Sequence, residues 1–151
     1  MVGSLSSAEA EAALERLSEL AVLLTDAMDR GLAQRGLTRS RAELLWRLRR
    51  QSPMTQRALS QALRCTPRNV TDLVDALEAA GLVARGPHPT DRRATLVRLT
   101  EQGEAAAARM EADSREAAAS LFADLSGAEL AAFVSALDRT LGRLREADRG
   151  P

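Results

Sequence analysis

Apolar residues at helical spacing predict that both ends of this chain are long amphipathic helices. Near the N-terminus, Ser6 or Ser7 stands where a helix cap belongs, and Gly31 and Gly36 mark the expected end. The apolar positions between them recur every three or four residues, namely Leu14, Leu17, Leu20, Val22, Leu24 and Met28. The last predicted helix follows Ser126–Gly127 and has one apolar face, formed by Leu130, Phe133, Val134, Leu137, Leu141 and Leu144.

The middle of the chain opens with a shorter helical pattern. It begins near Thr38 or Ser40, and Ser40 and Glu43 have the spacing of a capping box. It ends before Ser52–Pro53, because the residue before a proline disfavours the helical region.

Two further short helices follow, joined by a tight connection at residues 64–65. Thr55 caps the first, which covers residues 56–63. Thr66 and Pro67 start the second, because proline lacks the N–H that would be unpaired at the first helical position. Gly81 ends it, and its expected buried stripe consists of Val70, Leu73, Val74 and Leu77.

The sequence then predicts two β-strands, residues 82–85 and 94–99, on either side of a polar, turn-rich segment, 86–93. Thr100 then caps an alanine-rich helix that runs towards Leu121. A helix pair followed by a hairpin is a winged helix-turn-helix. We therefore expect a mainly α fold with a small β-hairpin wing. The N-terminal helix (1–36) and C-terminal helices (101–151) would form a dimerisation region around a DNA-binding lobe (37–100).

Composition supports a folded chain and limits its possible roles. The 151 residues are 45% hydrophobic, but Trp46, Phe122 and Phe133 are the only aromatic residues. No apolar run approaches the roughly 18 residues of a membrane span, and residues 1–7 lack the features of a signal peptide. The single cysteine, Cys65, excludes an internal disulfide framework. We expect a cytoplasmic protein.

Charge is unevenly distributed although the net charge is zero. Residues 38–100 contain 12 arginines and 5 acidic residues, a balance of +7, while the flanks hold 9 arginines and 16 acidic residues. A basic lobe between acidic ends is typical of binding to a polyanion, although chance segregation of solvated charge would give the same balance.

The predicted winged lobe places candidate base-reading side chains on one helix. Its second short helix would enter the major groove, where each base pair presents a distinct hydrogen-bonding pattern. Arg68 and Asn69, on the first turn, are the leading candidates for base contacts. Arg92 and Arg93 would reach the minor groove from the wing, and Asp91 would hold an arginine by a charge-assisted bond.

Two segments resemble the MarR family of bacterial transcriptional regulators. They are the run from Leu59 to Val83 and the wing from Pro89 to Thr100, which contains that family's Asp-x-Arg signature at Asp91 and Arg93. The following Glu101-Gln102-Gly103 also matches. The resemblance implies a homodimer that binds a near-palindromic duplex operator, and a repressor that a small lipophilic or phenolic effector releases.

The expected DNA-binding residues are Thr55, Gln56, Arg57, Thr66, Pro67, Arg68, Asn69, Thr71, Asp72, Asp91, Arg92 and Arg93. Asp72 departs from the arginine or lysine often found there in similar proteins. An aspartate can accept a hydrogen bond from cytosine N4, but its negative charge weakens the attraction to DNA phosphates. The base that this position would prefer therefore stays open.

Several residues admit a second interpretation. Met28, Leu45 and Trp46 would line an effector pocket or simply belong to the core. Cys65, just before a helix N-terminus, is either a packing residue or an oxidant sensor. His88 has no clustered partner, so we expect a solvated loop residue and no metal site.

Other function classes are less consistent with the sequence. No catalytic triad, phosphate-binding glycine loop or metal-ligand cluster is present, so we expect neither an enzyme nor a cofactor. The serious alternative is a winged-helix module that binds a protein partner. The sequence does not identify the operator, the regulated genes, the effector, or whether the protein represses or activates.

Overall fold

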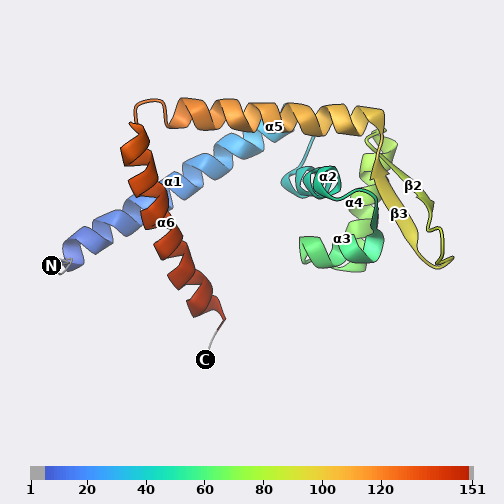
Figure 1. The fold of residues 1–151 in the computed structure, drawn as a ribbon, viewed down its shortest axis with the longest axis horizontal. Coiled ribbons are helices and arrows are strands. Elements are labelled where there is room, and N and C mark those ends of the chain that lie inside the picture. Colours follow the sequence, from blue (N-terminus) through green and yellow to red (C-terminus); the bar gives the residue numbers. More distant parts are fainter. Residues whose placement is uncertain (1–5, 150–151) are drawn as a thin grey trace. The chain divides into compact units, whose positions relative to one another are not determined.

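A computed structural model describes residues 6–149 as six helices and three short strands (Figure 1). Residues 1–5, on which the signal-peptide expectation partly rests, lie outside this range. The chain forms two compact units that divide within a helix, between Ala107 and Ala108. The elements are α1 (Ser7–Ala33), α2 (Arg39–Arg50), β1 (Met54–Thr55), α3 (Gln56–Leu63), α4 (Pro67–Ala79), β2 (Val83–Pro87), β3 (Thr95–Leu99), α5 (Glu101–Leu121) and α6 (Gly127–Asp148).

Side-chain caps define where α1, α3, α4 and α6 begin, at residues that the sequence indicated. The Ser6 hydroxyl accepts from the Glu9 N–H, and the Ser126 hydroxyl accepts from the Glu129 N–H. Both serines also form capping boxes, which satisfy two of the otherwise unpaired donors of a helix start. Gly31 lies inside α1, so the earlier of the two expected end signals is wrong.

The expected capping box at the start of α2 is wrong. Thr38 is the cap, and its hydroxyl accepts from the Arg41 N–H at 3.4 Å. Ser40 lies one residue inside the helix, where its backbone is already helical. A threonine two residues upstream therefore takes the capping position.

The wing belongs to a three-stranded antiparallel sheet rather than a two-stranded hairpin. Its strand order is β1-β3-β2, with Val83 opposite Leu99 and Pro87 opposite Thr95 in the hairpin. β1 adds Met54 opposite Val97. β1 has only two residues, too few to show any alternation, so no sequence pattern predicts it. The expected strand at 82–85 lies instead at residues 83–87.

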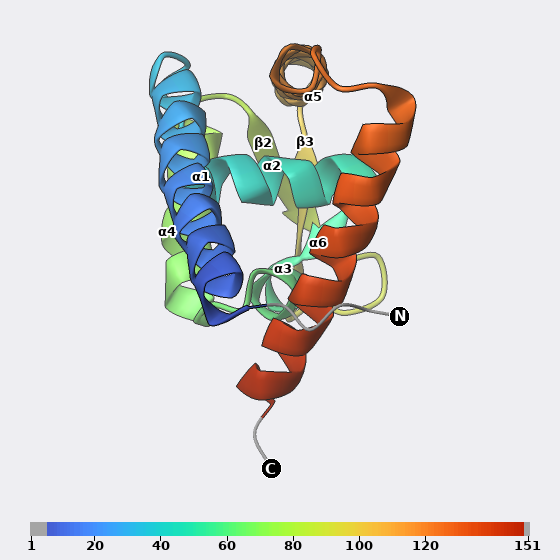
Figure 2. The same ribbon diagram turned by 90° about the vertical axis from the view of Figure 1, so that its left-hand side faces the viewer.

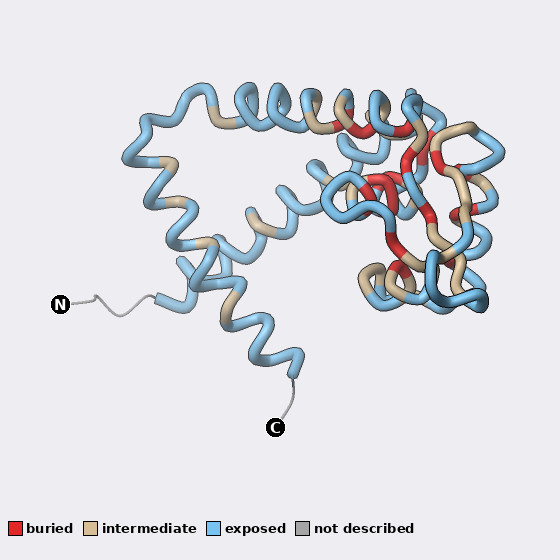
Figure 3. The backbone as a smooth tube through the Cα atoms, turned by 45° about the vertical axis from the view of Figure 1, so that its right-hand side comes forward, coloured by how far each residue is buried: buried red, intermediate tan, exposed pale blue. Residues whose placement is uncertain are grey.

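The main core lies inside the first unit, between the short helices and the sheet (Figure 3). Figure 2 shows α2 lengthwise, with β2 and β3 behind it. The largest side chains with almost no exposed surface are Leu44, Leu45, Leu48, Leu59, Val70, Val74, Leu77, Val83 and Val97. They come from α2, α3, α4 and both long strands, so this core fixes the helix pair against the wing. Leu73, expected in the same stripe, is only half-buried.

The base of the wing is tied to the start of α5 by close backbone contacts. The Thr100 hydroxyl donates to the Gly81 carbonyl at 2.6 Å and accepts from the Gly103 N–H at 3.0 Å. The Thr100 N–H donates to the Leu82 carbonyl at 3.1 Å. A Cβ on Gly103 would overlap that same carbonyl oxygen, so the residue has to be glycine for this approach.

Helices α1 and α6 contain no buried residue. Their exposed apolar side chains include Leu14, Val22, Leu23, Met28, Val134, Leu141 and Leu144, each at least 41% exposed. Within the second unit, Phe122 and Phe133 contact each other, with ring centroids 6.0 Å apart. No helix in the described range is both long enough and apolar enough to cross a membrane.

Candidate nucleic-acid interface

The first turn of α4 presents polar side chains on the face opposite its buried stripe. The Thr66 hydroxyl caps the helix by accepting from the Asn69 N–H at 3.2 Å, and Pro67 occupies the first helical position. Arg68, Asn69 and Asp72 are all exposed. Since Val70 and Val74 are completely buried, α4 is anchored through one face and leaves the other accessible.

Predicted contact residues on α3 lie beside this turn. Gln56, on the first turn of α3, donates through Nε2 to the Thr71 hydroxyl at 3.2 Å. That hydroxyl in turn donates to the Pro67 carbonyl at 3.0 Å. Thr55 caps α3 and Arg57 is exposed beside it. The structure therefore brings the α3 and α4 members of the predicted set together.

The wing tip is ordered by side chains that bind backbone N–H groups. His88 is half-buried, and its Nδ1 accepts from the Asp91 N–H at 3.1 Å and the Thr90 N–H at 3.3 Å. His88 is a loop residue as expected, and its ring also binds the backbone of the turn. Histidine shapes this turn because a neutral ring nitrogen can accept where the backbone offers donors.

Asp91 also binds the backbone rather than an arginine side chain. Its Oδ1 accepts from the Arg93 N–H at 2.9 Å, an interaction typical of aspartate two residues upstream in a turn. The expected charge-assisted bond to a guanidinium is therefore replaced by a turn-forming bond. Arg92 and Arg93 are both exposed at the tip.

Arg85 on β2, which no local sequence pattern indicates, lies at the centre of a charged cluster. Its Nη2 donates to Asp75 Oδ1 at 2.5 Å, and its Nη1 donates to Glu78 Oε2 at 2.6 Å. The Arg85 N–H also donates to Glu78 Oε1 at 3.1 Å. The Arg85 side chain is 24% exposed, far less than the two carboxylates that it joins.

The protonation equilibria of this cluster agree with its geometry. Hydrogen bonds from the Arg85 backbone N–H and side chain lower the pKa of Glu78. Partial burial lowers the pKa of Arg85, but the hydrogen bonds to Asp75 and Glu78 outweigh it and raise that pKa. Glu78 and Arg85 are therefore both charged at neutral pH.

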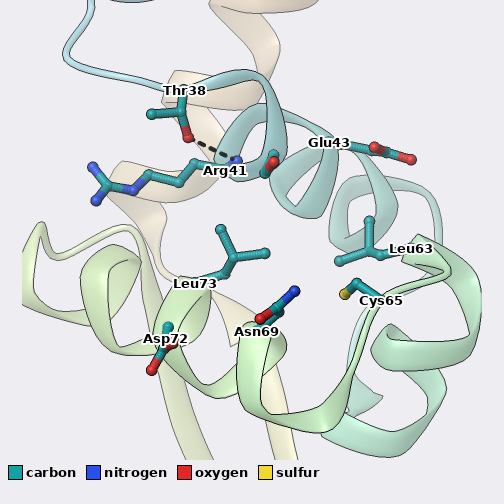
Figure 4. Close-up of a pocket in the computed structure, with 9 residues that line it drawn as sticks. Thr38, Arg41, Glu43, Leu63, Cys65, Asn69, Asp72 and Leu73 are labelled. Carbon is teal, nitrogen blue, oxygen red and sulfur yellow. Dashed lines mark hydrogen bonds between the residues drawn. The ribbon is translucent and has the colours of Figure 1, made fainter.

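A cavity of about 490 Å³ lies between α2 and the helix pair (Figure 4). Asn69, Leu63, Leu73 and Cys65 lie on one side, and Thr38 and Arg41 on the other. The half-buried Cys65 thus borders the cavity. A second cavity of about 480 Å³ adjoins the α1–α2 junction, where Arg39 and Asp29 form a bidentate ion pair.

The residues expected to line an effector pocket lie elsewhere. Leu45 has no exposed surface, whereas Met28 is 54% exposed. Trp46 is half-buried, and the Arg50 guanidinium lies over its ring, 5.1 Å from the centroid. None of the three borders either of the two cavities, so a pocket formed by them stays a prediction.

Comparisons with known proteins agree on one family. A family model described as the MarR family matches residues 37–95. An uncharacterized HTH-type transcriptional regulator of Bacillus subtilis, YdgJ, is 40% identical over 68 residues, which is 45% of this chain and 42% of that relative. The match thus spans less than half of the relative's length.

Solved structures extend the likeness to almost the whole chain. AbsC, a MarR family transcriptional regulator from Streptomyces coelicolor, is 26% identical with a TM-score of 0.75, covering 98% of this chain and 99% of AbsC. A complex of S. aureus MepR with DNA is 25% identical with a TM-score of 0.66, covering 85% of this chain and 97% of MepR.

Proposed function

This chain belongs to the MarR family of transcriptional regulators, and we propose that it binds a specific duplex DNA site as a homodimer. Family membership assigns a regulatory rather than an enzymatic role. The observation that carries the proposal is the exposed first turn of α4 in a lobe with seven more arginines than acidic residues. The MepR–DNA complex supports it, because a relative of the same fold binds DNA.

Specific recognition would come from α4 in the major groove. Arg68 can donate two hydrogen bonds to guanine O6 and N7, and Asn69 can pair with adenine. Asn69 also borders the cavity beside α2, so Arg68 is the better-placed base reader. Asp72, one turn further along, would accept from cytosine N4 and oppose nearby phosphates.

The wing would supply contacts that depend less on sequence. Arg92 and Arg93 are exposed at the tip of a turn that His88 and Asp91 hold in shape. A narrow minor groove concentrates negative potential, which attracts such side chains. Arg92 would therefore contribute mainly through charge and groove width.

Dimerisation would cover apolar surface that the chain leaves exposed. Leu14 and Leu144 are 65% and 63% exposed, and several apolar neighbours on α1 and α6 are similarly open. A two-fold dimer that pairs these helices would bury them and present two winged lobes to a near-palindromic operator. As a regulator that binds DNA, the protein would act in the cytoplasm.

A small molecule would control the binding of DNA. A repressor released by a lipophilic or phenolic effector agrees with the family resemblance. Release would act through Met28, which is 54% exposed, and the half-buried Trp46. Oxidation of Cys65 is the alternative signal, since its thiol borders a cavity next to α4.

Selection of bound fragments from a genomic library tests the function directly. The recovered fragments should share a near-palindromic sequence, and their affinity should fall steeply as salt rises, because phosphate contacts release counterions. A scrambled fragment of equal length is the control. Failure to enrich any sequence, together with no retention on heparin at low salt, would favour a protein-binding winged helix instead.

A further inference from the structure

Arg85 on β2 connects the wing to both helices of the helix pair, α3 and α4. From β2, its side chain reaches Asp75 and Glu78 on α4 at 2.5 and 2.6 Å, and its Nε donates to Gln56 Oε1 on α3 at 3.4 Å. Gln56 in turn donates through Nε2 to the Thr71 hydroxyl at 3.2 Å. A continuous network therefore runs from the wing to the first two turns of α4.

The side-chain donors of Arg85 are occupied by acceptors of the chain itself. Its two terminal nitrogens bind carboxylates, and its side chain is more covered than those of its partners. Arg92, by contrast, is exposed at the wing tip. One guanidinium also offsets two carboxylates that would otherwise repel a phosphate backbone.

We propose that Arg85 is a positioning residue for DNA recognition: it fixes α4 against the wing and orients Gln56 and Thr71, without contacting DNA itself. The inference rests on the proposed function, since it concerns how the lobe reads its site. Arginine suits this role because its planar, five-donor fork reaches several acceptors in fixed directions, whereas lysine offers a single point charge. Loss of the cluster should therefore reduce discrimination between DNA sequences more than it reduces the affinity for DNA in general.

A double-mutant cycle tests the proposal. The variants are Arg85→Met, Asp75→Asn/Glu78→Gln, and the combination of all three. The readout is the ratio of dissociation constants for scrambled and selected DNA, together with the salt slope. Arg85→Met should lower that ratio about tenfold and leave the salt slope unchanged. In the background without the two carboxylates, the same substitution should change the ratio much less.

The Arg85→Lys variant distinguishes the effect of the positive charge from the effect of the hydrogen-bond network. It keeps the positive charge but not the simultaneous bonds to Asp75, Glu78 and Gln56, so it should lose discrimination as Arg85→Met does. Far-UV circular dichroism and thermal melting establish that each variant is folded. If Arg85→Met itself unfolds, the comparison of Arg85→Lys with the unaltered protein decides the matter, because the positioning role predicts loss of discrimination in that variant too.

A direct phosphate contact would give a different pattern. Arg85→Met would then weaken selected and scrambled DNA equally, lower the salt slope by roughly one unit per lobe, and act identically with or without the carboxylates. Full discrimination in Arg85→Lys would also overturn the proposal. If the unaltered protein binds no DNA, the proposed function fails first, so the two failures are distinguishable.

Discussion

Replacement of Gly103 by alanine should destabilise the winged lobe, although alanine is the better helix former. The added Cβ would overlap the Leu82 carbonyl oxygen and would lie 3.3 Å from a Leu99 methyl group. The carbonyl is backbone and accepts from the Thr100 N–H, so it cannot turn aside without loss of that bond.

The gain in helix propensity from alanine can be compared with the costs of overpacking and of a weakened hydrogen bond. Alanine gains up to about 1 kcal/mol over glycine inside a helix. An overpacked contact typically costs about 1–3 kcal/mol, and a weakened hydrogen bond about 1 kcal/mol more. We expect a net loss of about 2 kcal/mol in the free energy of unfolding, which lowers the melting temperature by about 4–8 °C for a chain of this size.

Thermal unfolding followed by circular dichroism at fixed protein concentration measures this effect. Gly86→Ala is the control in the same lobe, because nothing lies within 4 Å of the Cβ that it would add. Its melting temperature should stay close to that of the unaltered protein. An equal or higher melting temperature for Gly103→Ala would refute the packing argument.

Three other predictions concern DNA binding, the thiol and assembly. Arg92→Ala should weaken selected and scrambled DNA by similar factors and reduce the salt slope by roughly one unit per lobe, and an unchanged slope would argue against a wing contact. Mild peroxide should leave DNA affinity unchanged in both the parent and Cys65→Ser; oxidation-dependent loss in the parent alone would make Cys65 a sensor. The unaltered protein should sediment as a dimer at micromolar concentration and Leu144→Asp as a smaller species, whereas a folded 16.2 kDa parent would contradict the dimer.

Local chemistry explains which elements could be predicted from the sequence. Thr55 and Thr66–Pro67 locate the starts of α3 and α4, because a cap and a first-position proline act within one helical turn. The exposed polar face of α4 follows from the periodicity of its buried face. For the same reason Arg68 could be selected without knowledge of any distant contact.

Features that depend on distant segments could not be predicted. β1 exists because Met54 pairs with Val97, and two residues have no periodicity of their own. Arg85 acquires its role only when β2 meets α3 and α4, so nothing in its immediate neighbours indicates it. The residues around Asp91 are consistent both with a bond to a guanidinium and with a turn, since an aspartate two residues before an N–H can accept from it, and only the folded wing shows the turn.

The effect of Arg68→Ala on DNA discrimination shows whether α4 reads base sequence through its exposed first turn. The measurement is the ratio of dissociation constants for scrambled and selected DNA, in the unaltered protein and in the variant, at one salt concentration. Loss of a bidentate base contact costs about 1–3 kcal/mol, so the ratio should fall about tenfold, with preference relaxed at one position per half-site. An unchanged ratio, whether affinity for both DNAs falls equally or for neither, would mean that Arg68 on α4 does not read base sequence.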